Sequence, residues 1–281
     1  MKLLTLEEAI TKVPAIATES PSPRVSGRYR FFSTKNVLEQ ALSNNWSIME
    51  AKGVTTRKVP TRFGAHSVRL IHNSQLQSET AEGFPTINLI NSHDLSKKLT
   101  LAIGYYRLIC SNGLIAPAGI ANAVNARHNF SNNNNSALLE AISQVFDQYS
   151  LITDQINKFK SRELSDSECS DLAQYAKRIR FRFRKNLPQK VDSNLLLNPR
   201  RPSDGNKDLW TVFNVIQENI THGGNGLGRG ITRFQDDIRF NTEMWQGTAL
   251  ALNHKKGNLK EELSKLFVKK TNNEDSNFGA N

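Results

Sequence analysis

The chain has 281 residues, with 37 Lys and Arg against 26 Asp and Glu, and its formal net charge is +11. Only 38% of the residues are hydrophobic, and no apolar run approaches the roughly 18 residues of a membrane-spanning helix. The composition therefore excludes an integral membrane protein, while 14 Phe, 3 Trp and 5 Tyr argue against a fully disordered chain. Two cysteines are too few for a disulfide framework, and the first residues lack a signal-peptide pattern. We expect a cytoplasmic protein without a membrane partner.

The first 32 residues indicate a flexible arm that is both basic and aromatic. Prolines and serines interrupt any regular structure there. Arg24, Arg28 and Arg30 surround Tyr29, and this mixture of charge and aromatic rings is typical of segments that hold a nucleic-acid strand. The alternative is a linker whose aromatic side chains dock on the core.

Residues 33–130 predict one helix followed by a mostly antiparallel sheet. Ser33 can cap a helix that ends at Asn44 and Asn45. Strands are then expected at Trp46–Lys52, His66–His72, Pro85–Asn91 and Leu99–Cys110. The connections between them are short, and short connections favour antiparallel pairing.

Residues 136–253 predict a helical region that packs on the sheet. The expected helices are Ala137–Arg162, a second one opened by a capping box at Ser165 and Glu168, Leu209–His222, and Asn241–Asn253. Residues 254–281 form a tail that we expect to be partly disordered. The fold class is thus α+β: an N-terminal helix and a mostly antiparallel sheet, followed by a helical C-terminal half.

Positive charge is concentrated near the middle of the chain. Residues 158–201 hold twelve basic and five acidic residues, a surplus of seven. Arginine contacts phosphate in a planar, bidentate manner, and an aromatic ring within a basic run can stack on a base. The candidate nucleic-acid-binding residues here are Lys177, Arg178, Arg180, Phe181, Arg182, Arg184 and Lys185. The alternative is a solvated helix whose arginines pair with carboxylates of the same chain.

A glycine-rich stretch, residues 223–230, follows one of the predicted helices. A dinucleotide-binding loop needs a strand before its glycines and a helix after them, and here the helix comes first. Gly223 is therefore interpreted as a helix cap. The stretch is either a plain connector or a loop that carries Arg229 and Arg233 toward a phosphate backbone.

Signals for metal binding and catalysis are weak. His66 and His72 share one strand face, and Glu218 and His222 lie one helical turn apart, but neither pair has a third ligand at a recognisable spacing. The remaining carboxylates that could hold a hard cation are Asp236, Asp237 and Glu243. We predict no cofactor, no metal and no catalytic residue, which leaves enzymatic activity uncertain and favours a non-enzyme.

Three segments together resemble a phage- and plasmid-borne family catalogued only as a domain of unknown function. They are residues 106–114 (YRLICSNGL), 209–224 (LWTVFNVIQENITHGG) and 237–245 (DIRFNTEMW). The resemblance covers roughly residues 30 to 253, and it implies a mobile-element context without an assigned reaction. The order of a helix ending at Asn45-Trp46, several strands and a long helix also resembles the core of single-strand annealing recombinases, which form rings that bind DNA in a basic groove.

Three hypotheses for function follow. The first is a mobile-element nucleic-acid-binding protein, above all a single-stranded DNA annealing or recombination accessory factor, with a homo-oligomer left open. The second is a host-defence inhibitor that binds a host protein through the apolar stripe of helix 137–162. The third is a metal-dependent nuclease that uses Asp236, Asp237, Glu243 and a histidine.

Overall fold

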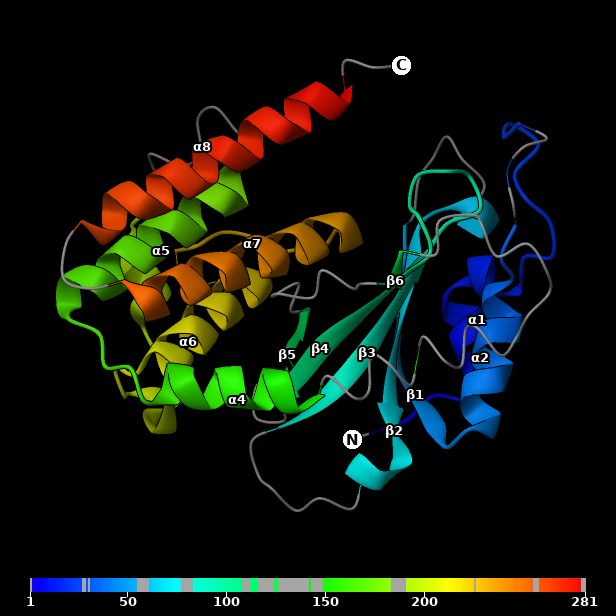
Figure 1. Cartoon of the computed structure of the whole chain (residues 1–281), viewed down its shortest axis with the longest axis horizontal. Coiled ribbons are helices and arrows are strands. Elements are labelled where there is room, and N and C mark those ends of the chain that lie inside the picture. Colours follow the sequence, from blue (N-terminus) through cyan, green and yellow to red (C-terminus); the bar gives the residue numbers. More distant parts are fainter. Residues whose placement is uncertain are drawn as a thin grey trace. The chain divides into compact units, whose positions relative to one another are not determined.

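The structure is a computed structural model, and it describes residues 2–26, 29, 31–54, 61–76, 83–107, 112–115, 124–125, 142, 149–182, 191–224, 226–254 and 258–278. The chain divides into two compact units, residues 1–153 and 154–281 (Figure 1). The first contains the sheet and two short helices, and the second is helical. The predicted α+β class is confirmed.

The sheet of the first unit is antiparallel throughout its described pairings. Its strands are β1 (Trp46–Gly53), β2 (His66–His72), β3 (Gly83–Asn91), β4 (Thr100–Arg107), β5 (Asn112–Ile115) and β6 (Val124–Asn125). They are ordered β1-β2-β3-β4-β5, and β6 pairs with β4. The predicted bounds of β2 match, because alternating apolar residues between turn residues fix both ends.

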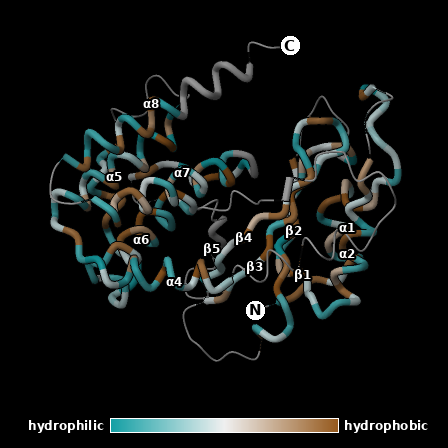
Figure 2. The backbone as a smooth tube through the Cα atoms, viewed as in Figure 1, coloured by the Kyte–Doolittle hydropathy of each residue, from teal (hydrophilic) through white to brown (hydrophobic). Residues whose placement is uncertain are grey.

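Helix α2 (Thr34–Ser43) begins and ends where the sequence predicts. The Ser33 side chain accepts a hydrogen bond from the backbone N–H of Asn36, which satisfies one free donor of the first turn. Beyond the helix, Asn45 has a φ of 63°, a left-handed conformation that asparagine tolerates better than most residues. Val37, Leu38 and Ala41 of α2 are buried, and Figure 2 shows hydrophobic residues on the helices α1 and α2 and on β2.

The N-terminal segment differs from the flexible arm that the sequence predicts. Helix α1 (Leu6–Lys12) starts with a capping box between Thr5 and Glu8, and a 3₁₀ turn, η1, follows at Pro14–Ala17. Ala9 and Ile16 are fully buried, and the backbone N–H of Leu4 donates to the carbonyl of Ile48 in β1, at 2.8 Å. The described part of this segment is thus packed on the sheet, since its few apolar residues suffice to anchor it.

Two buried histidines connect elements of this unit: His66 of β2 contacts α2, and His93, which follows β3, contacts η1. The His66 ring lies 2.8 Å from the Thr34 hydroxyl and 2.9 Å from the Gly64 carbonyl oxygen. The His93 ring lies 5.2 Å from that of His66 and 3.0 Å from the carbonyl oxygen of Ala15. Burial lowers the pKa of His66 to about 4 and also lowers the pKa of His93. Both rings are therefore neutral packing elements at pH 7.

The second unit consists of helices and short 3₁₀ turns. Its helices are α4 (Tyr149–Lys160), α5 (Asp166–Phe181), α6 (Leu209–His222), α7 (Phe234–Asn253) and α8 (Leu259–Phe278), with turns η5 (Ser193–Leu197) and η6 (Pro202–Asp204). The boundary between the two units falls within α4. No described helix combines the length and the hydropathy needed to cross a bilayer.

Aromatic rings form the core of this unit. Trp245 on α7 contacts Phe159 on α4, with ring centroids 5.0 Å apart, and Phe213 on α6, at 6.0 Å. Trp210 stacks on Phe213 at 5.7 Å. The four rings are at most 2% exposed, and their contacts join α4, α6 and α7.

The helix predictions are correct in part. Helix α6 has the predicted bounds, and α4 confirms the described end of the predicted helix 137–162, most of whose first half lies outside the described residues. Helix α7 begins at Phe234 and not at residue 241, and α8 continues to Phe278, into the part of the tail for which the sequence predicts disorder.

Candidate nucleic-acid interface

Helix α5 carries three of the basic residues predicted to bind nucleic acid: Lys177, Arg178 and Arg180. The predicted capping box is present: the Ser165 hydroxyl accepts from the backbone N–H of Glu168, and the Glu168 carboxylate accepts from that of Ser165. Toward the other end of the helix, Lys177 is half-exposed and Arg178 is exposed. Arg184 and Lys185 lie outside the described residues.

Two residues of the predicted set face the interior. Phe181 is 5% exposed, so its ring is not available to stack on a base. The Arg182 side chain is 3% exposed and forms an ion pair with the buried Glu243 of α7. A buried arginine needs such a partner because an unpaired charge inside a protein is costly. The structure thus gives neither side chain an exposed position, and Arg182 shows the internal pairing that the sequence left as the alternative.

Arg178 is engaged on one side by α8. Its guanidinium donates to the Ser264 hydroxyl at 2.8 Å and lies 4.5 Å from the centre of the Phe267 ring. The Arg182 guanidinium lies over the same ring, at 4.6 Å. Helix α8 thus covers part of the basic side of α5 through cation–π contacts.

Arg180 connects α5 to the glycine-rich stretch. One of its terminal nitrogens donates to the carbonyl oxygens of Arg229 and Gly230, each at 3.1 Å. From the other side, Arg200 donates to the carbonyl oxygen of Gly223 at 2.5 Å. These two arginines act on the backbone, and they fix where the stretch lies.

The glycine-rich stretch is a folded loop that requires its glycines. Gly223 and Arg229 form an antiparallel bridge, and the N–H of Gly224 donates to the carbonyl of Gly228 at 2.8 Å. Gly223 has a φ of 67°, and a Cβ there would lie 2.3 Å from the backbone nitrogen of Gly230. A Cβ on Gly230 would lie 2.2 Å from the Thr221 carbonyl oxygen. The loop therefore presents its side chains from a defined backbone.

The loop places exposed positive charge beside the end of α5. Arg229 and Arg233 are exposed, and neither forms an ion pair with any residue that the structure describes. Arg233 is the N-cap residue of α7, whose first turn carries Asp236 and Asp237. We call Arg229 and Arg233 the Gly-loop arginines.

The predicted residues of the N-terminal segment belong to the other unit. Arg24 is exposed, whereas Arg28 and Arg30 lie outside the described residues. The hydroxyl of the half-buried Tyr29 donates to the Ser92 carbonyl at 2.9 Å. Burial raises the pKa of this hydroxyl. Tyr29 thus docks on its own unit, in agreement with the alternative interpretation of this segment.

Sequence reasoning missed a buried polar network on α6. Glu218 pairs with Arg201, which also pairs with Asp204 at 3.0 Å; these contacts, the hydrogen bond to Glu218 foremost, raise the pKa of Arg201. The Asn219 amide donates to the carbonyls of Leu196 and Asn198, at 3.0 and 2.9 Å. No spacing rule reveals such a network, since the partners come from a loop that precedes the helix.

The carboxylates considered for a metal site do not converge. Asp236 pairs with Arg239 at 3.2 Å, Asp237 accepts from the Asn241 amide at 2.8 Å, and Glu243 pairs with Arg182. Within the described ranges, no group of three or more His, Cys, Asp and Glu residues could hold a metal ion. His72 likewise turns away from His66 and contacts the Ser74 hydroxyl at 2.7 Å.

The apolar stripe considered for binding a host protein is covered where it is described. Ile152 and Ile156 are each 3% exposed, and Phe159 is fully buried against Trp245. Leu151, at 63% exposed, lies off this stripe. The described stripe therefore serves the chain's own core.

Comparison with known sequences places the chain in a family. The sequence model of a family described as "Domain of unknown function (DUF932)" matches residues 23–245. The chain belongs to the DUF932 family. The matched DUF932 region contains the sheet, α5, the glycine-rich loop and α6, and it ends within α7, so α8 lies beyond it.

Two curated proteins are similar to this DUF932 chain over most of their length. They are the UPF0380 proteins YafZ and YfjQ of Escherichia coli strain K12, each 27% identical over 252 residues. Each alignment covers 86% of this chain and 89% of the relative. No solved structure matches.

Proposed function

We propose that the chain binds the phosphate backbone of single-stranded nucleic acid through the Gly-loop arginines. The observation that carries this proposal is the exposure of Arg229 and Arg233 without a carboxylate partner among the described residues, in a chain of net charge +11. Lys177, which is half-exposed and lies about one turn before Arg180 on α5, adds a further positive charge on that side of the helix. Unpaired arginines suit phosphate because the planar guanidinium fork can contact two phosphate oxygens at once, and a defined backbone lowers the cost of ordering on binding.

The proposed role is that of an accessory factor in DNA annealing or recombination in a mobile element. Support comes from the order of the N-terminal unit, in which helix α2 leads into an antiparallel sheet, since this order resembles the core of annealing recombinases. That resemblance concerns fold, and fold alone does not fix function. Backbone contacts through arginine would give little sequence preference, which suits a protein that handles arbitrary strands.

A charge-matched pair of variants tests the proposal. Arg229→Ala/Arg233→Ala removes two loop charges, and Lys158→Ala/Lys269→Ala removes two exposed charges from other helices of the same unit. Fluorescence anisotropy of a labelled 20-nucleotide single strand at several salt concentrations measures the affinity. The slope is that of the logarithm of the binding constant against the logarithm of the salt concentration. In the arginine variant its magnitude should decrease by about 1.4, because each lost phosphate contact reduces it by about 0.7. In the lysine variant the slope should change little. Equal reductions in both variants, or a wild-type affinity independent of salt, would refute the proposal.

A further inference from the structure

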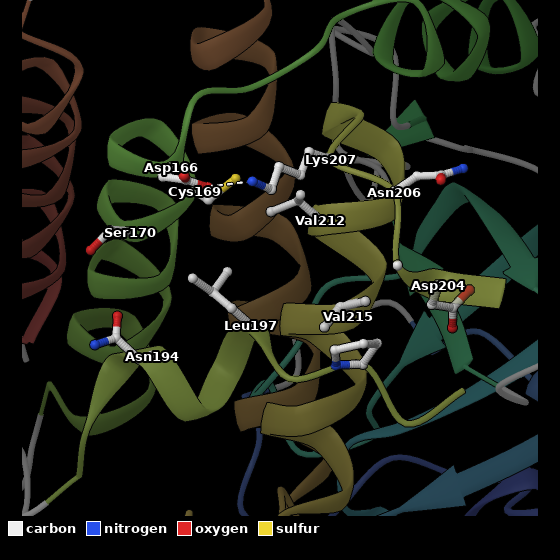
Figure 3. A pocket seen from close by; sticks show the side chains of 12 residues that line it. Asp166, Cys169, Ser170, Asn194, Leu197, Asp204, Asn206, Lys207, Val212 and Val215 are labelled. Carbon is white, nitrogen blue, oxygen red and sulfur yellow. Dashed lines mark hydrogen bonds and ion pairs between the residues drawn. The ribbon is translucent and has the colours of Figure 1, made fainter. Parts of the chain in front are cut away.

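A cavity of about 310 Å³ lies between α5, η5 and the first half of α6 (Figure 3). Its apolar walls come from Leu197 and Pro199 and, on α6, from Val212 and Val215. This volume is at the lower end of the roughly 300–1,000 Å³ of small-molecule sites. The cavity therefore suits a single ring system better than a large ligand.

The charges around the cavity are already neutralised. Lys207 and Asp166 pair across 2.6 Å, as the dashed line in Figure 3 marks, and Asp204 pairs with Arg201 at 3.0 Å. Burial raises the pKa of the Cys169 thiol, which keeps it uncharged. A ligand with its own charge would find no free counter-charge among the lining residues, so the cavity selects a neutral group.

Polar side chains without an internal partner lie around the same walls. Asn194, Asn206 and Ser170 line the cavity, and their side chains form no hydrogen bond with any described residue. An asparagine amide offers a donor and an acceptor side by side, which is the arrangement that matches the edge of a nucleobase. Aliphatic side chains can enclose the two faces of such a ring.

The cavity adjoins the glycine-rich loop. A Cβ on Gly226 would lie 3.0 Å from a methyl group of Leu195, which belongs to the same 3₁₀ turn as Leu197. Arg200, next to Pro199 in sequence, is hydrogen-bonded to the Gly223 carbonyl. Along α6, Val215 and Gly223 are eight residues apart, about 12 Å at 1.5 Å per residue. A few nucleotides of a single strand of nucleic acid can span this distance between the cavity and the loop.

We infer that this cavity receives one unpaired base of the strand whose phosphates contact the Gly-loop arginines. The inference rests on the proposed function and adds a base site to it. A base in a duplex has its hydrogen-bonding edge occupied, and thus the cavity also favours single over double strands.

The test uses the full chain and a single strand that contains one 2-aminopurine, whose emission is quenched by stacking on neighbouring bases. Because none of the described residues that line the cavity is aromatic, insertion should unstack the probe and raise its emission severalfold on binding. Val215→Phe should abolish this rise by filling the cavity, and Asn206→Ala/Asn194→Ala should reduce it. In both variants the affinity measured by anisotropy should stay within about threefold of wild type, because the arginines still bind the strand. The matched control is Asn157→Ala, an exposed asparagine on α4.

The outcomes separate this inference from the proposed function. If wild type binds by anisotropy without a rise in emission, or if the rise is the same in the cavity variants, the base site is overturned and backbone binding stands. If wild type does not bind the strand at all, both fail. Thermal unfolding confirms that each variant is folded, and the asparagine double variant decides the matter if Val215→Phe unfolds.

Discussion

Acidification should selectively weaken the N-terminal unit through His66. The ring is fully buried, and its pKa is lowered from the ordinary 6.5 to about 4, chiefly by burial. In the unfolded chain His66 takes up a proton as the pH falls through 6.5, whereas the folded chain leaves it neutral until about pH 4. The unfolded state therefore gains stability across this window, and folding stability falls as the pH falls.

The size of the effect follows from the difference between the two pKa values. A gap of about 2.5 units at 1.36 kcal/mol per unit gives a loss of about 3 kcal/mol between pH 6.5 and 4. His93, whose pKa is also lowered by burial, changes stability in the same direction. Because the free energy of unfolding of folded proteins is typically about 5–15 kcal/mol, a loss of this size is easily detected.

Amide hydrogen exchange in β2, corrected for the intrinsic pH dependence of exchange, measures this loss locally. Wild type and His66→Gln should be compared from pH 7 to pH 4, because glutamine keeps a hydrogen-bonding side chain but does not titrate. The wild-type opening free energy should fall by about 3 kcal/mol more than that of the variant. Parallel pH profiles for the two proteins would refute the assignment of His66 as a buried neutral ring.

Three further perturbations test contacts of the helical unit. Glu243→Gln should destabilise the chain by about 3–5 kcal/mol in urea denaturation, because it leaves the buried Arg182 charge without its carboxylate; a change below about 1 kcal/mol would show that water reaches the pair. Ser165→Ala should cost about 1 kcal/mol by removing the cap of α5, with no change in strand affinity. Gly230→Ala should distort the loop and weaken strand binding, since its Cβ would meet the Thr221 carbonyl oxygen at 2.2 Å; an affinity equal to that of wild type would mean that loop geometry does not matter.

Local signals account for what the sequence could predict. Helix α6 has the predicted bounds because Asp208 caps its start and Gly223 its end, and both act on adjacent backbone. Helix α7 starts earlier than the sequence predicts, because its N-cap, Arg233, makes no side-chain capping bond and thus leaves no recognisable pattern. Strand β2 was also predictable from local sequence, because its alternating apolar residues lie between turn residues.

The candidate site depended on contacts that are distant in sequence. The partner of Arg182 is 61 residues away on another helix, so no periodicity in α5 could show that this arginine points inward. The link from Arg180 to the loop spans about 50 residues and involves carbonyl oxygens, which every residue carries. Charge density located the basic region, but only the tertiary structure separates the arginines that hold the fold from those that face outward.

The position of Phe267 bears on how the protein can be truncated. Its ring supports two guanidinium groups of α5 from a helix that begins after the family region ends. A fragment trimmed to residues 23–245 would lack that ring and the buried Leu259 and Leu263 of the same helix, so it would expose apolar surface and leave Arg178 without its contacts to Ser264 and Phe267. Such a fragment should adhere to polyanions indiscriminately, and its behaviour would misrepresent the full chain.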